Sequence, residues 1–122
     1  MNILICGATG FIGRNILEYY LKKTKHNIYA VYNLKKKYIS DSRIKWINCD
    51  LRDENKVNKL TKNMDIVIQA AATTTGSRDA INQPYVHVTD NAIMNALIFK
   101  SCFKNNVKHC IFFSCTTMYK SS

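Results

Sequence analysis

Three evenly spaced glycines near the start of the chain constrain its fold more than any other feature. They lie in Gly7-Ala8-Thr9-Gly10-Phe11-Ile12-Gly13, between the apolar run Asn2–Cys6 and a helical pattern. This G-x-x-G-x-x-G spacing is one residue wider than the G-x-G-x-x-G turn of dinucleotide-binding βα units. Gly7 permits a tight turn, Gly10 lets backbone amides approach a pyrophosphate, and Gly13 lets the helix pack closely on the sheet. We therefore predict a pyrophosphate-binding βα turn; the alternative is that these are only turn glycines.

Beyond this turn, strand-like apolar runs alternate with helical patterns along the chain. Further strands are predicted at residues 27–32, 44–49, 65–72 and 109–114, and further helices at residues 53–63 and after Pro84. The alternation carries no hairpin signals, and right-handed crossovers leave few other topologies. The sequence therefore predicts an α/β fold with a doubly wound parallel sheet, in one unit that spans residues 1–122.

Apolar stripes predict which faces of the two longer helices are buried. The first helix should end near Thr24, and its stripe comprises Ile12, Ile16, Leu17, Tyr20 and Leu21. The stripe of the long helix comprises Ile93, Met94, Leu97, Ile98 and Cys102. Spacings of three and four residues place each set on one helical face. We expect both faces to lie against the sheet.

The chain is strongly basic, with a formal net charge of +10. Such a charge could indicate a polyanionic partner. Only Lys35, Lys36 and Lys37 form a run, however, and no platform of aromatic and basic residues accompanies them, so we expect no nucleic-acid binding. No stretch approaches the roughly 18 apolar residues of a membrane span, and none resembles a signal peptide. We expect no membrane partner.

Cysteine usage indicates the redox compartment. The five cysteines are Cys6, Cys49, Cys102, Cys110 and Cys115. They are odd in number, scattered and free of any C-x-x-C pair, which fits neither a disulfide framework nor a zinc site. We therefore expect no bound metal and a cytoplasmic location.

Several motifs together resemble one known family. The turn Ala8-Thr9-Gly10-Phe11-Ile12-Gly13 resembles the opening of the extended short-chain dehydrogenase/reductases, the nucleotide-sugar epimerases and dehydratases. The resemblance implies a Rossmann fold and a nicotinamide cofactor. Asp50-Leu51 resembles the family's Asp-Leu pair, whose carboxylate contacts the adenine amino group; the alternative is a helix N-cap. Residues 65–72 resemble the family's fourth strand, although Gln69 stands where a histidine is frequent.

The long helix carries further family-like positions. Pro84, Asn91 and Asn95 resemble the family's proline and asparagines at the start of this helix and within it, where the alternative is ordinary capping. Within the family, the segment from Pro84 to Asn91 and residues 108–113 most resemble GDP-L-fucose synthase.

The end of the second strand bears on the choice between NADP and NAD. An NAD-specific protein would place an acid there to bind the ribose hydroxyls, but the chain reads Val31-Tyr32-Asn33. Arg14 and the run from Lys35 could instead neutralise a 2′-phosphate. We predict NADP over NAD; the alternative is that Arg14 is a solvated helix residue and the lysine run a mobile loop. The predicted cofactor-binding residues are Gly7, Thr9, Gly10, Phe11, Ile12, Gly13, Arg14, Asn33, Lys35, Asp50, Leu51, Ala70, Ala71, Ala72 and Asn91.

Catalysis in this family uses a hydroxyl residue and a Tyr-x-x-x-Lys pair. By resemblance the hydroxyl position is Cys115, whose thiol is a poor substitute, so Ser114 or Thr116 could act instead. No lysine stands four residues after Tyr119, and in the family the pair lies farther on than this. We therefore expect the chain to be the cofactor half of a longer enzyme, inactive by itself.

Two functions follow from these expectations. In the first, the complete enzyme passes hydride between the nicotinamide and a carbon of a nucleotide-sugar substrate, and this chain supplies cofactor binding. In the second, the chain is a non-catalytic NADP-binding module or regulator. Because a sheet that ends at its fifth strand leaves an open edge, a homodimer is also possible.

Overall fold

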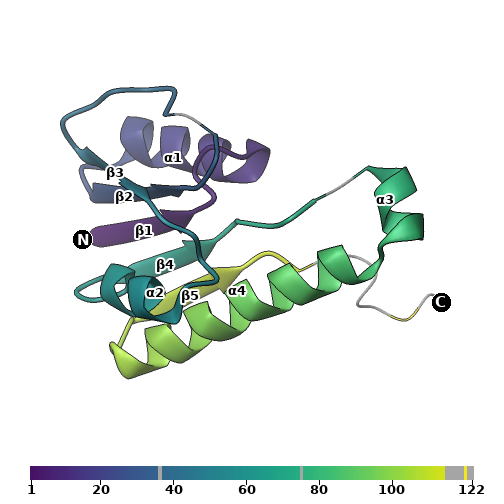
Figure 1. Cartoon of the computed structure of the whole chain (residues 1–122). Coiled ribbons are helices and arrows are strands. Elements are labelled where there is room, and N and C mark those ends of the chain that lie inside the picture. Colours follow the sequence, from purple (N-terminus) through teal and green to yellow (C-terminus); the bar gives the residue numbers. More distant parts are fainter. Residues whose placement is uncertain (36, 75, 115–119, 121–122) are drawn as a thin grey trace.

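In the computed structural model, which describes residues 1–35, 37–74, 76–114 and 120, parallel strands form one sheet with helices on both faces (Figure 1). The strands are β1 (Asn2–Cys6), β2 (Asn27–Tyr32), β3 (Ile44–Asn48), β4 (Ile66–Gln69) and β5 (His109–Phe112). The helices are α1 (Phe11–Lys23), α2 (Glu54–Leu60), α3 (Ser77–Asn82) and α4 (Tyr85–Lys104). The spatial order is β3-β2-β1-β4-β5, and every neighbouring pair is parallel. The predicted α/β fold with a doubly wound parallel sheet is confirmed.

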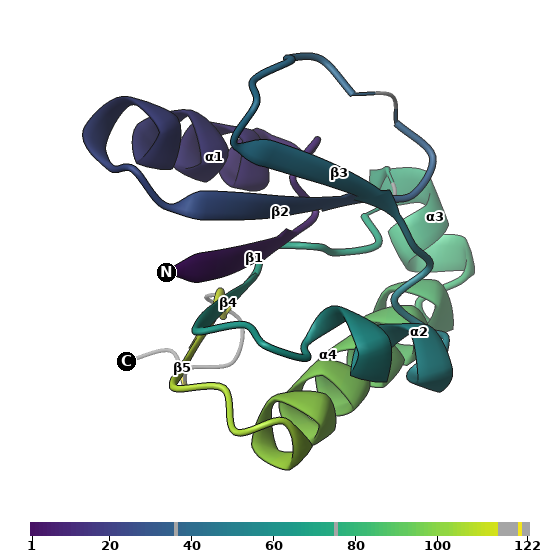
Figure 2. The same cartoon turned by 90° about the vertical axis from the view of Figure 1, so that its left-hand side faces the viewer.

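The alternation of side chains along β1 divides the core into two clusters. Ile3 and Ile5 point to the face covered by α1, where they pack with Leu17. Leu4 and Cys6 point to the opposite face, where α2 and α4 lie. Figure 2 shows these helices on the two sides of the sheet. Because β1 is buried on both faces, its sequence is apolar at nearly every position rather than alternating.

The strand order reverses between β1 and β4, and this reversal fixes where a ligand can bind. The first crossover leads from β1 through α1 to β2 on one side, whereas β4 pairs with the other side of β1. In open α/β sheets, ligands bind outside the carboxyl ends of the strands at such a switch point. Gly7 directly follows the carboxyl end of β1 and therefore lies at this position.

Several elements are shorter than predicted. β4 and β5 end at Gln69 and Phe112, in register with the end of β1 at Cys6, whereas β3 ends at Asn48, opposite the end of β2 at Tyr32. Because β1 turns away at Gly7, the ladder ends at this level. α2 likewise ends at Leu60 rather than at residue 63, and Asn63 adopts a positive φ of 61°.

Two predicted core positions are exposed. Ile12 has 44% of its surface accessible and Ile93 has 40%. Ile12 lies in the first turn of α1, and the buried residues of that helix are Gly13 and Leu17. In α4 the buried face runs through Met94, Ile98 and Cys102, so Ile93 lies beside this face rather than on it.

The chain between β4 and α4 contains a short helix that was not predicted. α3 spans six residues, begins after Gly76 and has no side-chain cap at its N-terminus. Among the described residues, no helix has the length and apolar character needed to cross a membrane.

Candidate functional site

The glycine turn has a geometry in which two of its glycines admit no side chain. Gly7 has a φ of 74°, and a Cβ there would lie 2.7 Å from the Ala71 backbone. A Cβ on Gly13 would lie 2.2 Å from the Gly7 carbonyl oxygen. Both distances are far shorter than real Cβ contacts. The turn therefore brings the start of α1 against the end of β1, and the loop after β4 against Gly7.

Gly10 differs from the other two glycines of the turn. Its φ of −78° and ψ of 170° suit any residue, and a Cβ would lie 3.3 Å from the Gly7 oxygen. Its amide closes the turn by donating to that oxygen at 3.0 Å. A side chain at Gly10 would thus be tight against the Gly7 oxygen, but it would overlap far less than one at Gly7 or Gly13.

The first turn of α1 leaves its backbone donors without protein partners. Gly10 is the N-cap, no side chain caps it, and the first turn contains no acid. Within the described part of the chain, the amides of Phe11, Ile12 and Gly13 donate to no acceptor. Phe11 and Ile12 are exposed, and Thr9 is partly exposed. Free amides and the positive end of the helix dipole together fit an anion such as a pyrophosphate.

The loop after β4 is held to α4 by three side-chain amides. Gln69 is buried and donates from Nε2 to Asn95 Oδ1 at 2.9 Å and to the Ala71 carbonyl at 3.2 Å. Asn91 Oδ1 accepts from the Thr73 amide at 2.7 Å, and its Nδ2 donates to the Thr73 carbonyl at 3.1 Å.

These contacts exclude capping as the role of Asn91 and Asn95. The N-cap of α4 is Pro84, which makes no side-chain cap, and both asparagines lie inside the helix. They fix the segment Ala70-Ala71-Ala72, of which Ala72 is exposed and the other two are partly exposed. The small alanine side chains leave the backbone of this segment close to the glycine turn.

At the end of β3, Asp50 is held by Arg52. Asp50 Oδ1 accepts from the Arg52 amide and from Nε, both at 3.0 Å, and Oδ2 accepts from Nη2 at 2.8 Å. The Arg52 guanidinium lowers the pKa of the Asp50 carboxyl to about 2. Leu51 is buried in the core cluster that faces α4. The N-cap alternative for Asp50 is wrong, because α2 is capped by Asp53, which accepts from the Lys56 amide at 3.1 Å.

The residues predicted to determine the preference for NADP or NAD lie in α1 and in the loop after β2. The Arg14 guanidinium stacks over the Tyr38 ring, 4.1 Å from its centroid, and its Nε lies 3.4 Å from Glu18 Oε1. Arg14 and Tyr38 line a cavity of about 520 Å³. The Asn33 carbonyl accepts from Asn48 at 2.7 Å, and Lys35 is exposed. Arg14 is thus half-exposed, with contacts to Tyr38 and Glu18.

The predicted catalytic positions are only partly covered by the structure. Ser114 follows β5 and is exposed. Cys115 and Thr116 lie outside the described residues. Among the residues that are described, no cluster of His, Cys, Asp or Glu could hold a metal ion.

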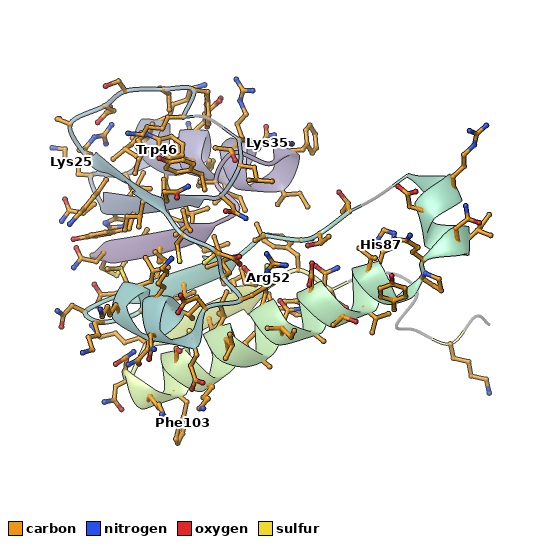
Figure 3. All side chains as sticks on the ribbon, in the orientation of Figure 1. Lys25, Lys35, Trp46, Arg52, His87 and Phe103 are labelled. Atoms are coloured by element: carbon orange, nitrogen blue, oxygen red, sulfur yellow. The ribbon has the colours of Figure 1, made fainter. Side chains whose placement is uncertain are left out.

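Two contacts at the candidate site were not predicted from the sequence. Arg52 reaches from the loop after β3 toward α4 (Figure 3), where its Nη1 donates to Asp90 Oδ2 at 3.3 Å. Gln69 joins β4 to Asn95. The acid-x-arginine spacing of Asp50 and Arg52 could have indicated the bond between those two residues, whereas no sequence pattern indicated Asp90 or Asn95 as partners.

Comparisons with known proteins agree with this geometry. The family model described as "NAD dependent epimerase/dehydratase family" matches residues 3–122. A UDP-D-apiose/UDP-D-xylose synthase of Arabidopsis thaliana is 30% identical over 128 residues, covering 98% of this chain and 32% of the relative. An inverting UDP-N-acetylglucosamine 4,6-dehydratase of Campylobacter jejuni is 31% identical over 117 residues, covering 90% of this chain and 35% of the relative.

A solved structure shows the same fold. The UDP-glucose 4-epimerase of Thermotoga maritima superposes with a TM-score of 0.78 at 22% identity, over 92% of this chain and 37% of that one. The chain spans about a third of the length of the curated relatives that it matches.

Proposed function

Because the chain belongs to the NAD-dependent epimerase/dehydratase family, we propose that it binds a nicotinamide dinucleotide with the pyrophosphate at the N-terminus of α1. The observation that carries this proposal is the set of backbone amides at Phe11, Ile12 and Gly13 that have no acceptor in the described part of the chain. A pyrophosphate would accept from these amides and complement the helix dipole. The loop that contains Ala71 would border the ribose and nicotinamide side.

The adenine end would lie against the end of β3. There Asp50 would accept a hydrogen bond from the adenine amino group, and Leu51 would support the loop from the core. The Asp50 carboxyl is ionised at neutral pH, as an ordinary aspartate is, and so can act only as an acceptor.

For the complete protein, we propose a nucleotide-sugar epimerase, dehydratase or reductase. The nicotinamide would accept or donate hydride at a sugar carbon, and this chain would bind and orient the cofactor. The names of the relatives favour a UDP-sugar as the substrate; the narrower resemblance to GDP-L-fucose synthase stays a prediction. A cytoplasmic location also stays a prediction, which the free thiols of Cys6, Cys49, Cys102 and Cys110 support.

Gly10→Val tests the site. The substitution suits the backbone conformation of Gly10 but places methyl groups where the pyrophosphate would approach. We expect it to weaken NADPH binding by at least about tenfold, with only a modest fall in the urea midpoint from the 3.3 Å approach of its Cβ to the Gly7 oxygen. Fluorescence titration of NADPH measures the affinity, and urea unfolding followed by circular dichroism measures the stability.

The matched control is Gly76→Val, at a glycine whose Cβ would meet nothing within 4 Å. It should bind NADPH as the unaltered chain does. Equal NADPH affinity for Gly10→Val and Gly76→Val would refute the placement of the pyrophosphate.

Arg14→Met tests the preference for NADP. The end of β2 lacks the acid that an NAD-specific protein would place there, and Arg14 is the cation nearest to the glycine turn in sequence. We expect the unaltered chain to bind NADPH more tightly than NADH, and Arg14→Met to reduce that ratio by about tenfold or more, because a hydrogen bond to a charged group contributes about 1.5–3 kcal/mol. Parallel titrations with both cofactors measure the ratio. Arg78→Met, on exposed α3, should leave it unchanged; an unchanged ratio in Arg14→Met as well would remove Arg14 from cofactor choice.

A further inference from the structure

One segment of α4 holds both of the loops that would border the cofactor. Asp90 accepts from Arg52, which belongs to the loop after β3. The next residue, Asn91, bonds to both backbone groups of Thr73 in the loop after β4. These two loops follow strands that lie on opposite sides of β1. The spacing between the proposed adenine end and the ribose side of the site is therefore set through α4.

Arg52 leaves Asp50 able to bind a ligand. A carboxylate offers about four acceptor positions. Arg52 occupies two of them at Oδ1 and one at Oδ2. One acceptor position at Oδ2 is thus left for an outside donor. The fork of the guanidinium fixes the plane of the carboxylate, and so fixes the direction in which that position points.

The contact with Asp90 attaches the pair of Arg52 and Asp50 to α4. Within its own loop, Arg52 bonds only to a residue two positions away, so the loop and the carboxylate could move together. Nη1 connects the pair to Asp90 on α4, 38 residues further along the chain. The Arg52 side chain is 47% exposed, and ion pairs with such exposure contribute little to stability. The contact instead holds the Arg52 guanidinium, and with it the Asp50 carboxylate, in place relative to α4.

We propose that Arg52, anchored by Asp90, is a positioning residue that orients Asp50 toward the amino group of the adenine. This inference rests on the proposed function, because it takes the dinucleotide as the ligand. Arg52 touches the carboxylate and not the cofactor. Its effect should therefore appear as selectivity for the adenine amino group.

The test compares NADPH with its deaminated analogue, in which hypoxanthine replaces adenine and an oxygen replaces the amino group. The unaltered chain should bind NADPH about tenfold more tightly, because the analogue turns an acceptor toward the Asp50 carboxylate. In Arg52→Met this ratio should fall close to one. Arg52→Lys keeps the charge but lacks the fork, so it should restore little of the ratio.

Asp90→Asn provides a second variant with nearly the same shape. It weakens the anchor on α4 and leaves the contacts between Arg52 and Asp50 in place, so the ratio should fall part of the way. Arg78→Met serves as the control and should keep the full ratio. Thermal midpoints of all variants should lie close to that of the unaltered chain, since the ion pairs are half exposed.

The possible failures are distinguishable. If the unaltered chain bound neither compound, the proposed function would fall and this inference with it. If the chain bound NADPH with the expected preference, and both Arg52→Met and Asp90→Asn kept that preference in full, only the positioning role would be overturned.

Discussion

Gly13→Ala is expected to destabilise the chain by about 3–5 kcal/mol, a large part of the stability of a small domain. The added Cβ would lie 2.2 Å from the Gly7 carbonyl oxygen and 2.8 Å from its carbon. Both of these are backbone atoms at the end of the central strand, so no flexible side chain can move aside. α1 would have to shift away from β1, which would open the cluster around Ile5 and Leu17. Urea unfolding followed by circular dichroism measures the change in unfolding free energy.

Gly76→Ala is the matched control for this substitution. A Cβ there meets nothing within 4 Å, and its φ of −67° suits alanine. We expect a change within about 0.5 kcal/mol. If Gly13→Ala unfolded at the same urea concentration as Gly76→Ala, the close approach of α1 to β1 would be wrong.

Ile98→Ala is expected to cost about 2–5 kcal/mol. Ile98 is completely buried between α4 and the sheet, in the cluster that contains Leu4 and Val67. Removing its side chain leaves a cavity under the middle of α4. Because this helix also carries Asn91 and Asn95, cofactor binding should weaken along with stability. Thermal and urea unfolding measure the first effect, and NADPH titration measures the second.

Ile93→Ala makes the same chemical change on the same helix. Ile93 is 40% exposed, so its loss should cost under about 1 kcal/mol. Both isoleucines belong to the apolar stripe predicted from the sequence, and the structure separates them. Equal costs for the two substitutions would contradict the orientation of α4.

The strands and the two main helices could be predicted because their signals are local. An apolar run followed by a glycine turn defines β1 and the start of α1 without reference to the rest of the chain. The lengths of β3, β4 and β5 could not be predicted in this way. They depend on where the neighbouring strands end, at Cys6 for β4 and β5 and at Tyr32 for β3, and this register is set by pairing between distant segments.

The site was predictable at its glycines and less so elsewhere. Gly7 and Gly13 are required by backbone contacts that follow from the tight turn. Asn91 was identified by position, but its bonds to Thr73 depend on how α4 lies beside the loop after β4. The contact between Arg52 and Asp90 is likewise a product of the tertiary fold. Sequence patterns can identify such residues, but their partners depend on how the helices, strands and loops pack in the folded chain.

The central claim is that the start of α1 binds the pyrophosphate of a nicotinamide dinucleotide. Nuclear magnetic resonance of the ¹⁵N-labelled chain, titrated with NADPH, tests it directly because it observes each backbone amide. We expect saturable shifts that are largest at Phe11, Ile12 and Gly13, whose amides have no acceptor in the described part of the chain. Saturable shifts elsewhere with these amides unchanged, or no saturable shifts at all, would contradict it.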